Sequence, residues 1–486
     1  MRRIYASTLD FDDIRAEFDI PDEYPRDALE QVGQLRDAFA DERVDARNIP
    51  FVTIDPEGSM DLDQALHVTE HADGFTLRYA IADLGALIPI GSPLDVEAKR
   101  RGQTIYIPDG KSPLHPVELS EGVGSLLPDV DRLASLWTID IDREGSMTGS
   151  SLERAVIRSR AKLDYVAVQG WFDSGRELPE AVSGLRAFGE LRQAQAVARG
   201  AVELELPAQE VTFDGAGRAH LGWQARTAVD AWSSQCSLAT GHIAAEIMLD
   251  GAVGILRTLR PATEESTREF ADAVSALGLR WDGSTSPGEF LHELPRGDVR
   301  TLAAHTAATK LLRGADYRAF DGERPQGDDR IHAGVANTYA HATAPLRRLV
   351  DRFVTECCHA IVAGKEPAPE IRESLDEVRE RMIESGRLAN TVDNACISKV
   401  EALALTGRIG EHFDAAVTRS SRAADGDKKA KPGEVMILRP PVTAECAGEV
   451  RAGTVIDAVV EEANPGKRSV RFRASGEAAP TAPTGS

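Results

Sequence analysis

Short apolar runs between residues 49 and 141 are rich in β-branched and aromatic side chains and are bounded by Gly, Pro or Asp, a pattern typical of β-strands. The predicted strands span residues 50–54, 65–68, 75–81, 104–107 and 136–141. From about residue 155 the spacing of apolar positions becomes mostly helical, and it predicts helices over 227–249, 264–277, 299–313, 344–362 and 371–404. The middle of the chain is therefore expected to be a large mixed α/β domain.

Two other patterns flank this part. Residues 1–48 predict a short acidic helix over 10–17 and a second helix over 28–39, with prolines between them. From residue 407 the strand pattern returns over 412–418, 435–438, 442–446, 455–461 and 470–473. Five short strands in sequence predict a small β-barrel of the OB type, a common oligonucleotide binder, although a barrel without a ligand has the same pattern.

These patterns predict an α+β protein with four parts: a helical N-terminal appendage over 1–48, a mixed α/β domain over 49–404, an OB-like β-barrel over 405–476 and a disordered tail over 477–486. No run approaches 18 consecutive apolar residues, so no membrane span is expected, and the first residues lack the apolar stretch of a secretory signal. Five cysteines without CxxC spacing are expected to be reduced thiols of a cytoplasmic protein.

The net charge of −22 argues at first against a nucleic-acid partner, because such proteins usually carry a basic surface. The charge is uneven, however: it is −6 over residues 1–48, −17 over 49–406 and +1 over 407–486. A basic loop that contains Lys428 and Lys429 lies between two predicted barrel strands. The barrel is thus expected to contribute RNA contacts.

Three carboxylates, Asp55, Asp61 and Asp63, lie between two predicted strands, so we expect them in a loop at a sheet edge. Asp61 and Asp63 are two residues apart, which places both on one face of an extended chain. Clustered carboxylates repel one another unless a cation neutralises them, and oxygen ligands without His or Cys favour Mg²⁺ or Mn²⁺. Such a site suits phosphoryl transfer. The alternative is an acidic loop exposed to solvent.

A second cluster contains Arg347 and Arg348, which follow Thr343 and Pro345. Thr343 is predicted to be the N-cap of a helix and Pro345 to lie in its first turn. Backbone amides at the helix N-terminus and the two guanidinium groups would then form a phosphate site. In the alternative interpretation, one arginine pairs with Asp351 and the other is solvated.

Taken in order, these segments resemble the RNB catalytic domain of the ribonuclease II / RNase R family. The resemblance extends over roughly residues 48–360, and the predicted barrel is similar to the S1 domain that follows RNB in this family. It is carried by the acidic loop and by segments 92–95, 100–109 (RRGQTIYIPD), 116–120, 131–134, 161–165 (AKLDY) and 339–351 (YAHATAPLRRLVD).

The resemblance implies a processive 3′→5′ exoribonuclease that hydrolyses single-stranded RNA to nucleoside 5′-monophosphates with Mg²⁺. It implies that Asp55, Asp61 and Asp63 bind the metal and orient the water, and that Arg347 contacts the scissile phosphate. We expect a monomer that needs no obligate protein partner.

The resemblance also implies that Tyr165 clamps the nucleotide near the cut and that Tyr339 borders the same site. A core aromatic is the alternative for Tyr165. Arg348, with Lys428 and Lys429 of the barrel, completes the expected RNA contacts.

Several positions depart from the family pattern. Gln64 stands where the family usually has a fourth carboxylate; its amide oxygen can still ligate Mg²⁺, but with less charge. Ala344 and Leu349 replace a serine and an aromatic residue of the arginine signature, and Ser233 and Ser234 stand where adjacent glutamates are common. These changes leave open a weakly active or non-catalytic RNB-like protein that binds RNA or regulates other nucleases. A third alternative, a metal-dependent phosphoesterase for small nucleotides, would need a closed pocket and no RNA-contacting barrel.

Overall fold

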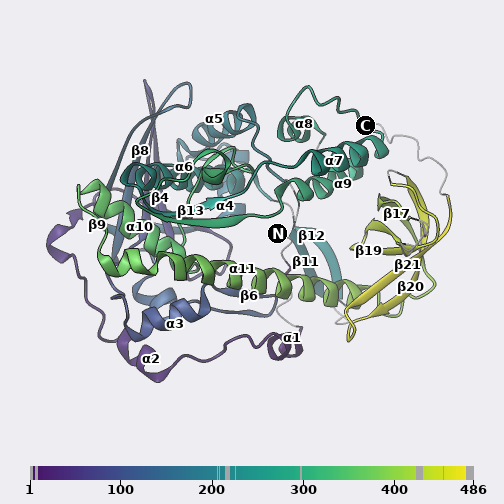
Figure 1. The fold of residues 1–486 in the computed structure, drawn as a ribbon, viewed down its shortest axis with the longest axis horizontal. Helices are drawn as coiled ribbons and strands as arrows, with labels where there is room; N and C mark the ends of the chain where they lie inside the picture. Colours follow the sequence, from purple (N-terminus) through teal and green to yellow (C-terminus); the bar gives the residue numbers. More distant parts are fainter. Residues whose placement is uncertain are drawn as a thin grey trace.

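The computed structural model describes residues 4–5, 9–204, 206, 208–213, 219–224, 226–295, 298–422, 431–452 and 454–477. Figure 1 shows a large mixed α/β body and a small β-barrel at opposite ends of the molecule, joined along the long helix α11 (Pro369–Ala404). The predicted α+β class is confirmed. Within these residues no helix is long and apolar enough to cross a membrane. The predicted tail lies outside the described residues from 478 onward.

A seven-stranded sheet forms the centre of the large body, in the order β10-β3-β4-β5-β8-β9-β2. Its strands are β2 (Val44–Asp45), β3 (Val52–Asp55), β4 (Gln64–His71), β5 (Gly74–Ala82), β8 (Asp131–Asp142), β9 (Met147–Arg158) and β10 (Ala161–Asp164). Neighbours are antiparallel except for the pairs β3–β10 and β2–β9. The predicted strand over 104–107, β6 (Ile105–Ile107), instead pairs with β7 (Gly110–Ser112) in a separate hairpin.

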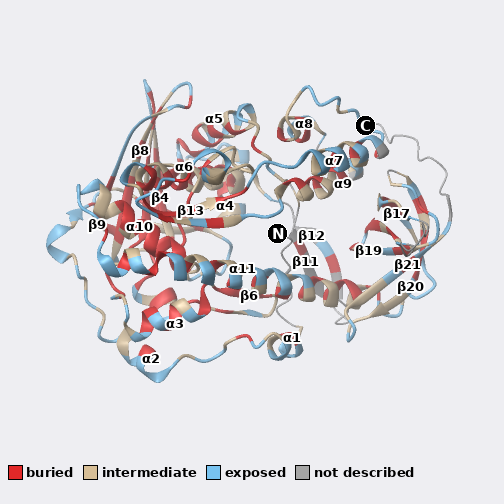
Figure 2. Ribbon diagram, in the orientation of Figure 1, coloured by how far each residue is buried: buried red, intermediate tan, exposed pale blue. Residues whose placement is uncertain are grey.

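Alternating side chains of the central strands point to opposite faces, as a β-strand requires. Leu77 and Trp137 pack on one face, whereas Ala80 and Leu136 pack on the other. The first face is covered by helices that include α4 (Tyr165–Ser174), α5 (Leu185–Ala198), α6 (Ala228–Gly251) and α10 (Leu349–Val362). Figure 2 shows that the buried residues concentrate in this layer.

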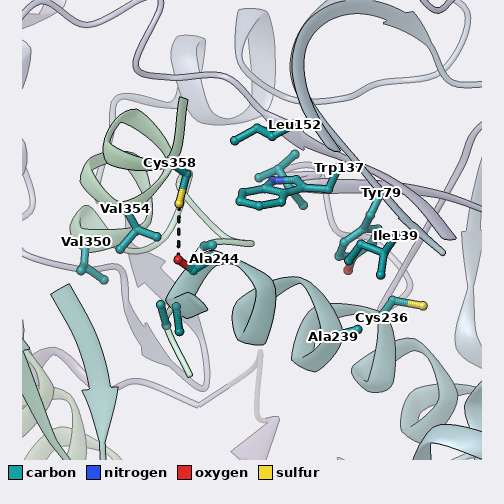
Figure 3. Packing of buried hydrophobic residues seen from close by; sticks show 14 of the residues in the cluster. Tyr79, Trp137, Ile139, Leu152, Cys236, Ala239, Ala244, Val350, Val354 and Cys358 are labelled. Atoms are coloured by element: carbon teal, nitrogen blue, oxygen red, sulfur yellow. Dashed lines mark hydrogen bonds between the residues drawn. The ribbon is translucent and has the colours of Figure 1, made fainter. Parts of the chain in front are cut away.

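Helix α6 lies against both the sheet and α10, and its small residues allow a close approach. In Figure 3, Ala239 and Ala244 face the strands and α10, and the thiol of Cys358 donates to the carbonyl of Ala244 at 3.5 Å. All five cysteines of the chain are buried and unpaired.

The rest of the large body surrounds this core. Its helices are α3 (Pro93–Arg101), α7 (Glu264–Ala276), α8 (Pro287–Glu293) and α9 (Val299–Ala308). Its short strands form small sheets: β1 (Ile4–Tyr5) with β11 (Ala208–Phe213) and β12 (Ala219–Gln224), β13 (Val253–Thr258) with β14 (Asp316–Asp321), and β15 (Ile331–His332) with β16 (Asn337–Thr338).

The C-terminal part is a closed barrel in the order β17-β18-β19-β21-β20, which confirms the predicted OB-like fold. The strands are β17 (His412–Arg419), β18 (Gly433–Leu438), β19 (Pro441–Ala447), β20 (Val455–Asn464) and β21 (Ser469–Glu477). Val400 of α11 and Leu405, just after it, belong to the same apolar cluster as the barrel interior. Residues 423–430, and with them Lys428 and Lys429, lie outside the described residues.

The N-terminal residues are packed into the molecule rather than appended to it. Phe11 and Ile14, beside and within α1 (Asp12–Glu17), are fully buried in the cluster shared by α11 and the barrel. Lys399 of α11 pairs with Asp13 at 2.6 Å, and Arg468 of the barrel pairs with Glu17. This segment therefore links the barrel to α11.

The second N-terminal helix, α2, spans Arg26–Val32 and is shorter than predicted. Gly33, a poor helix former, directly follows it. Further on, the ring of Phe39 stacks 3.6 Å from the guanidinium of Arg154, and Asp37 pairs with Arg43. These tertiary contacts hold the chain in turns where the apolar spacing predicted helix.

Candidate active site

The acidic loop connects β3 to β4, two interior strands, and lies at the edge of the sheet where these strands end. Asp55 is the last residue of β3, and Asp63 directly precedes β4. The loop leaves the sheet at its end, with Asp61 15% exposed and Asp63 only 5% exposed at their side chains.

Burial dominates the electrostatics of these carboxylates. It raises the pKa of Asp55 to about 7 and that of Asp63 to about 8, while the charge of Arg347 lowers both. Asp61 adds to the rise at both neighbours, which shows that the three groups lie within electrostatic reach of one another. A cation at this place would favour the ionised forms.

Asp63 is fixed by the segment that precedes α10. The amide of Leu346 donates to Asp63 Oδ1 at 2.7 Å, and Arg347 Nε lies 3.4 Å from Asp63 Oδ2. The amide of Ala344 donates to Asp351 Oδ1 at 2.7 Å. These carboxylates bind backbone amides in a turn, and α10 begins only at Leu349. The predicted helix start at 344 is therefore wrong.

The two arginines have different surroundings. Arg348 forms a two-pronged ion pair with the fully buried Asp351, at 2.8 Å from Nε and 2.7 Å from Nη2. Arg347 lies beside Asp63 with its side chain 35% exposed. Neither arginine lies in a first helical turn, and Arg348 pairs with Asp351 as the alternative interpretation expects. A phosphate contact of Arg347 or Arg348 stays a prediction.

Most of the expected nucleotide-contacting residues line one cavity of about 290 Å³. Its lining comprises Ile54, Gln64, Leu66, Tyr79, Tyr165, Ser233, Ser234, Ser237, Leu238, Tyr339, Thr343, Arg347 and Arg348. Asp55 adjoins this cavity. The backbone of Asp55 in β3 lies opposite that of Asp164 in β10, and the next residue, Tyr165, lines the cavity. The cavity therefore lies beside the acidic loop.

The two tyrosines are placed by local structure. Tyr165 is the first residue of α4, whose N-cap Asp164 accepts from the amide of Ala167 at 2.8 Å. Tyr339 packs against α6 at Gly241, where a Cβ would lie 2.3 Å from the ring. Only glycine allows this close approach.

Gln64 belongs to a chain of polar contacts across the cavity. Its amide nitrogen donates to Thr343 O at 2.5 Å, and its oxygen accepts from Tyr79 OH at 3.0 Å. Tyr79 OH also lies 2.9 Å from Ser237 Oγ. In this structure the amide of Gln64 therefore forms part of the cavity wall, and these hydrogen bonds link it to Thr343 and Tyr79. The buried hydroxyl of Ser233 has no hydrogen-bond partner within the described residues.

Two residues near the carboxylates were given no role by the sequence reasoning. Lys111 Nζ lies 3.0 Å from Asp61, and Tyr106 is its cross-strand partner in the β6–β7 hairpin. The side chain of Tyr106 is exposed, and Arg347, Asp61 and Asp63 lie within electrostatic reach of it. The sequence did hold one indication of this hairpin. In the segment 104–112 (TIYIPDGKS), Tyr106 and Lys111 stand on either side of the turn residues Pro108, Asp109 and Gly110.

The N-terminal segment holds this hairpin at both ends. Arg15 makes a two-pronged pair with Asp109 in the hairpin turn, at 2.9 and 2.6 Å. Tyr24 OH donates to Pro113 O at 2.5 Å, next to the end of β7. The position of Lys111 and Tyr106 thus depends on residues far away in the sequence.

Replacing Arg15 by alanine should lower the free energy of unfolding by about 1–2 kcal/mol, because a charge-assisted pair is lost. Amide hydrogen exchange over residues 105–112 should become faster. The control is Arg26→Ala, since the pair of Arg26 with Glu30 is exposed and such pairs contribute less than about 1 kcal/mol. Equal effects of the two substitutions would contradict this role.

The donor set suits a hard cation held by few protein ligands. Within the described ranges no group of three or more His, Cys, Asp or Glu side chains is arranged to hold a metal ion. Mg²⁺ is commonly bound by one or two carboxylates together with waters and substrate phosphates, so a ready-made cage is not required. One or two of the carboxylates of Asp55, Asp61 and Asp63, with waters and a substrate phosphate, would suffice for such an ion.

Two known protein families match this chain. The family described as the RNB domain matches residues 43–364, and the RNase II-type exonuclease C-terminal S1 domain matches residues 411–475. Ribonuclease R of Escherichia coli (strain K12) is 30% identical over 370 residues, which cover 72% of this chain and 44% of that protein. The chain thus spans about half the length of the curated relatives it matches.

Solved structures share the fold. The apo form of Mycoplasma genitalium RNase R superposes with a TM-score of 0.79 at 18% identity, covering 95% of this chain and 77% of that one. The same enzyme in complex with ribose methylated single-stranded RNA gives a TM-score of 0.78 at 18% identity, with the same coverage.

Proposed function

The chain belongs to the RNB family, and on this premise we propose that it is a metal-dependent 3′→5′ exoribonuclease that releases nucleoside 5′-monophosphates. One observation carries the proposal: the buried carboxylates meet Arg347 directly beside a cavity lined by two tyrosines. A phosphodiester placed against Arg347 would thus lie between a hydrolytic centre and a nucleotide pocket.

Each group has a defined task in this mechanism. Asp55, Asp61 and Asp63 would hold the ion, and their negative charge orients the attacking water. Bound Mg²⁺ would supply charge stabilisation and lower the pKa of that water. Arg347 binds the phosphate and stabilises the charge that develops on its oxygens. Asp63 and the amide of Leu346 keep Arg347 in place.

We propose RNA as the substrate class and a monomer as the active form. Tyr165 and Tyr339 can stack on a base, which is independent of sequence because every base has a π-face. A related enzyme from Mycoplasma genitalium was solved with single-stranded RNA, which supports this choice. Gln64, Tyr79 and Ser237 form a polar wall suited to the sugar edge of the nucleotide.

The test uses single-stranded RNA labelled at its 5′ end, incubated with the full chain and Mg²⁺. The proposal expects a ladder of labelled products shortened stepwise from the 3′ end, with unlabelled nucleoside 5′-monophosphates released. Circular RNA of the same sequence is the control, since an exonuclease needs an end.

Binding without hydrolysis in either Mg²⁺ or Mn²⁺ would overturn the proposal in favour of a non-catalytic RNA-binding protein. Immediate release of the labelled terminal nucleotide would overturn the direction of attack. Hydrolysis of dinucleotides with no binding of longer RNA would indicate the small-nucleotide phosphoesterase.

Replacing both Lys428 and Lys429 by alanine should weaken the binding of long single-stranded RNA. If each lysine neutralises one phosphate, the slope of log K against log salt should fall by about 1.4. The charge-matched control replaces the exposed residues Arg26 and Lys365. An unchanged slope in fluorescence anisotropy titrations would show that these lysines do not contact RNA.

A further inference from the structure

Lys111 is built into the surroundings of the acidic loop. Its Nζ atom lies 3.0 Å from Asp61 Oδ1 and 2.9 Å from Glu121 Oε1, and its side chain is 24% exposed. Pairing of β7 with β6 fixes its backbone, and Glu121 comes from the helical turn η2 (Glu118–Val123). An ammonium group therefore occupies the flank of Asp61.

Cationic side chains thus face two of the three carboxylates. Arg347 lies 3.4 Å from Asp63, and Lys111 lies 3.0 Å from Asp61. By contrast, no hydrogen bond or ion pair holds the carboxylate of Asp55 within the part of the chain that the structure describes. Asp55 is therefore left to meet an added cation.

The charges at this place favour no more than a single divalent ion. Four carboxylates meet three side-chain cations there, a net charge of −1 when all are ionised: Asp55, Asp61, Asp63, Glu121, Lys111, Lys162 and Arg347. Nucleases that use two metal ions place them only about 4 Å apart, with carboxylates to hold both. A second ion here would have to lie next to the ammonium group of Lys111, where it is repelled.

We propose that Lys111 is a resident cation of the acidic site, which supplies positive charge beside Asp61 so that the site takes up one divalent ion rather than two. This inference rests on the proposed metal-dependent hydrolysis. Lys111 then limits the affinity for the divalent ion while RNA is absent. The simpler alternative is that Lys111 only ties β7 to η2 through Glu121.

Two substitutions that change the net charge in opposite directions separate the electrostatic role of Lys111 from a purely structural role through Glu121. Lys111→Gln removes the positive charge and also breaks the ion pair with Glu121. Glu121→Gln breaks the same tie but removes a negative charge. If Lys111 acts through its charge, the first substitution strengthens binding of a divalent ion and the second weakens it. If Lys111 is only a tie, both act in the same direction.

The experiment measures Mn²⁺ binding to the full chain without RNA, from the electron paramagnetic resonance signal of free Mn²⁺. We expect one ion per wild-type chain. Lys111→Gln should bind Mn²⁺ at least about tenfold more tightly, since even water-like screening leaves a sizeable repulsion at this range. Lys111→Arg, which keeps the charge, should match the wild type. Thermal unfolding verifies that each variant is folded, with Lys111→Met as a second uncharged variant.

Two ions on the wild-type chain, or unchanged or weaker binding by both uncharged variants, would overturn the inference while the proposed function stands. Equal shifts in Lys111→Gln and Glu121→Gln would do the same. A wild-type chain that binds no Mn²⁺ would overturn the metal-dependent function together with the inference, so the two failures are distinguishable.

Discussion

Replacing Asp63 by asparagine should reduce RNA hydrolysis about a thousandfold while RNA binding stays within about threefold of wild type. The substitution removes a buried charge that faces Arg347 and the proposed ion. Asparagine keeps an oxygen that can accept from the amide of Leu346, so the turn before α10 should persist. Single-turnover hydrolysis and anisotropy titration, both with Mg²⁺, measure the two quantities.

Stability separates this effect from damage to the fold. Burial raises the pKa of Asp63 to about 8, so ionising it costs free energy in the folded chain that lacks the ion. Asparagine removes this cost, and the urea midpoint of Asp63→Asn without metal should be equal to or above that of wild type. The control is Asp73→Asn in the exposed turn between β4 and β5. Hydrolysis at the wild-type rate would exclude Asp63 from the site.

Replacing Arg154 by methionine should lower the free energy of unfolding by about 3–5 kcal/mol, the largest loss of stability we expect from one substitution. Arg154 joins Asp83 to Glu356, with all four of its carboxylate contacts at 2.8 Å. The side chains of Arg154 and Asp83 are 5% and 1% exposed. Methionine fills a similar volume but leaves two buried carboxylates without this partner.

Arg158→Ala on the same strand is the matched control. Its pair with Asp131 is exposed, so its loss should cost less than about 1 kcal/mol. Part of the loss in Arg154→Met should be recovered as pH falls. Burial already raises the pKa of Glu356 in the folded chain, and without Arg154 it rises further. Protonation at low pH removes the buried charge. Equal losses in the two variants, measured by urea unfolding, would contradict this account.

The main strands and helices could be predicted from the sequence because residues that face the core are apolar and recur with the period of their strand or helix. The strands β3, β4, β5 and β8 and the five barrel strands all show apolar alternation or β-branched runs, and each was found to within a few residues. Strand β9 was missed, because its first half is polar and extends beyond the core. Periodicity reports which residues face a core, and a strand outside the core leaves no such record.

Part of the site was predictable for a different reason. Tyr165, Tyr339 and Arg347 were singled out by motif and do line one cavity, and Asp55 and Asp63 do adjoin it. A motif states which residue types recur together but not which atoms they contact. For that reason the pairing of Arg348 with Asp351 and the contacts of Gln64 with Tyr79 were left open or unforeseen.

The sequence by itself determined the parts: a mixed α/β domain, a five-stranded barrel, and the acidic loop and segments 161–165 and 339–351 that we propose to form the site. The tertiary structure decided how they act together. The start of α10 at Leu349 is set by Asp63 and Asp351, which bind the amides of the preceding turn. The place of Lys111 beside Asp61 is set by a hairpin that Arg15 holds. These contacts join residues up to 283 positions apart, and local periodicity cannot encode a hydrogen bond whose partner arrives only when the chain has folded.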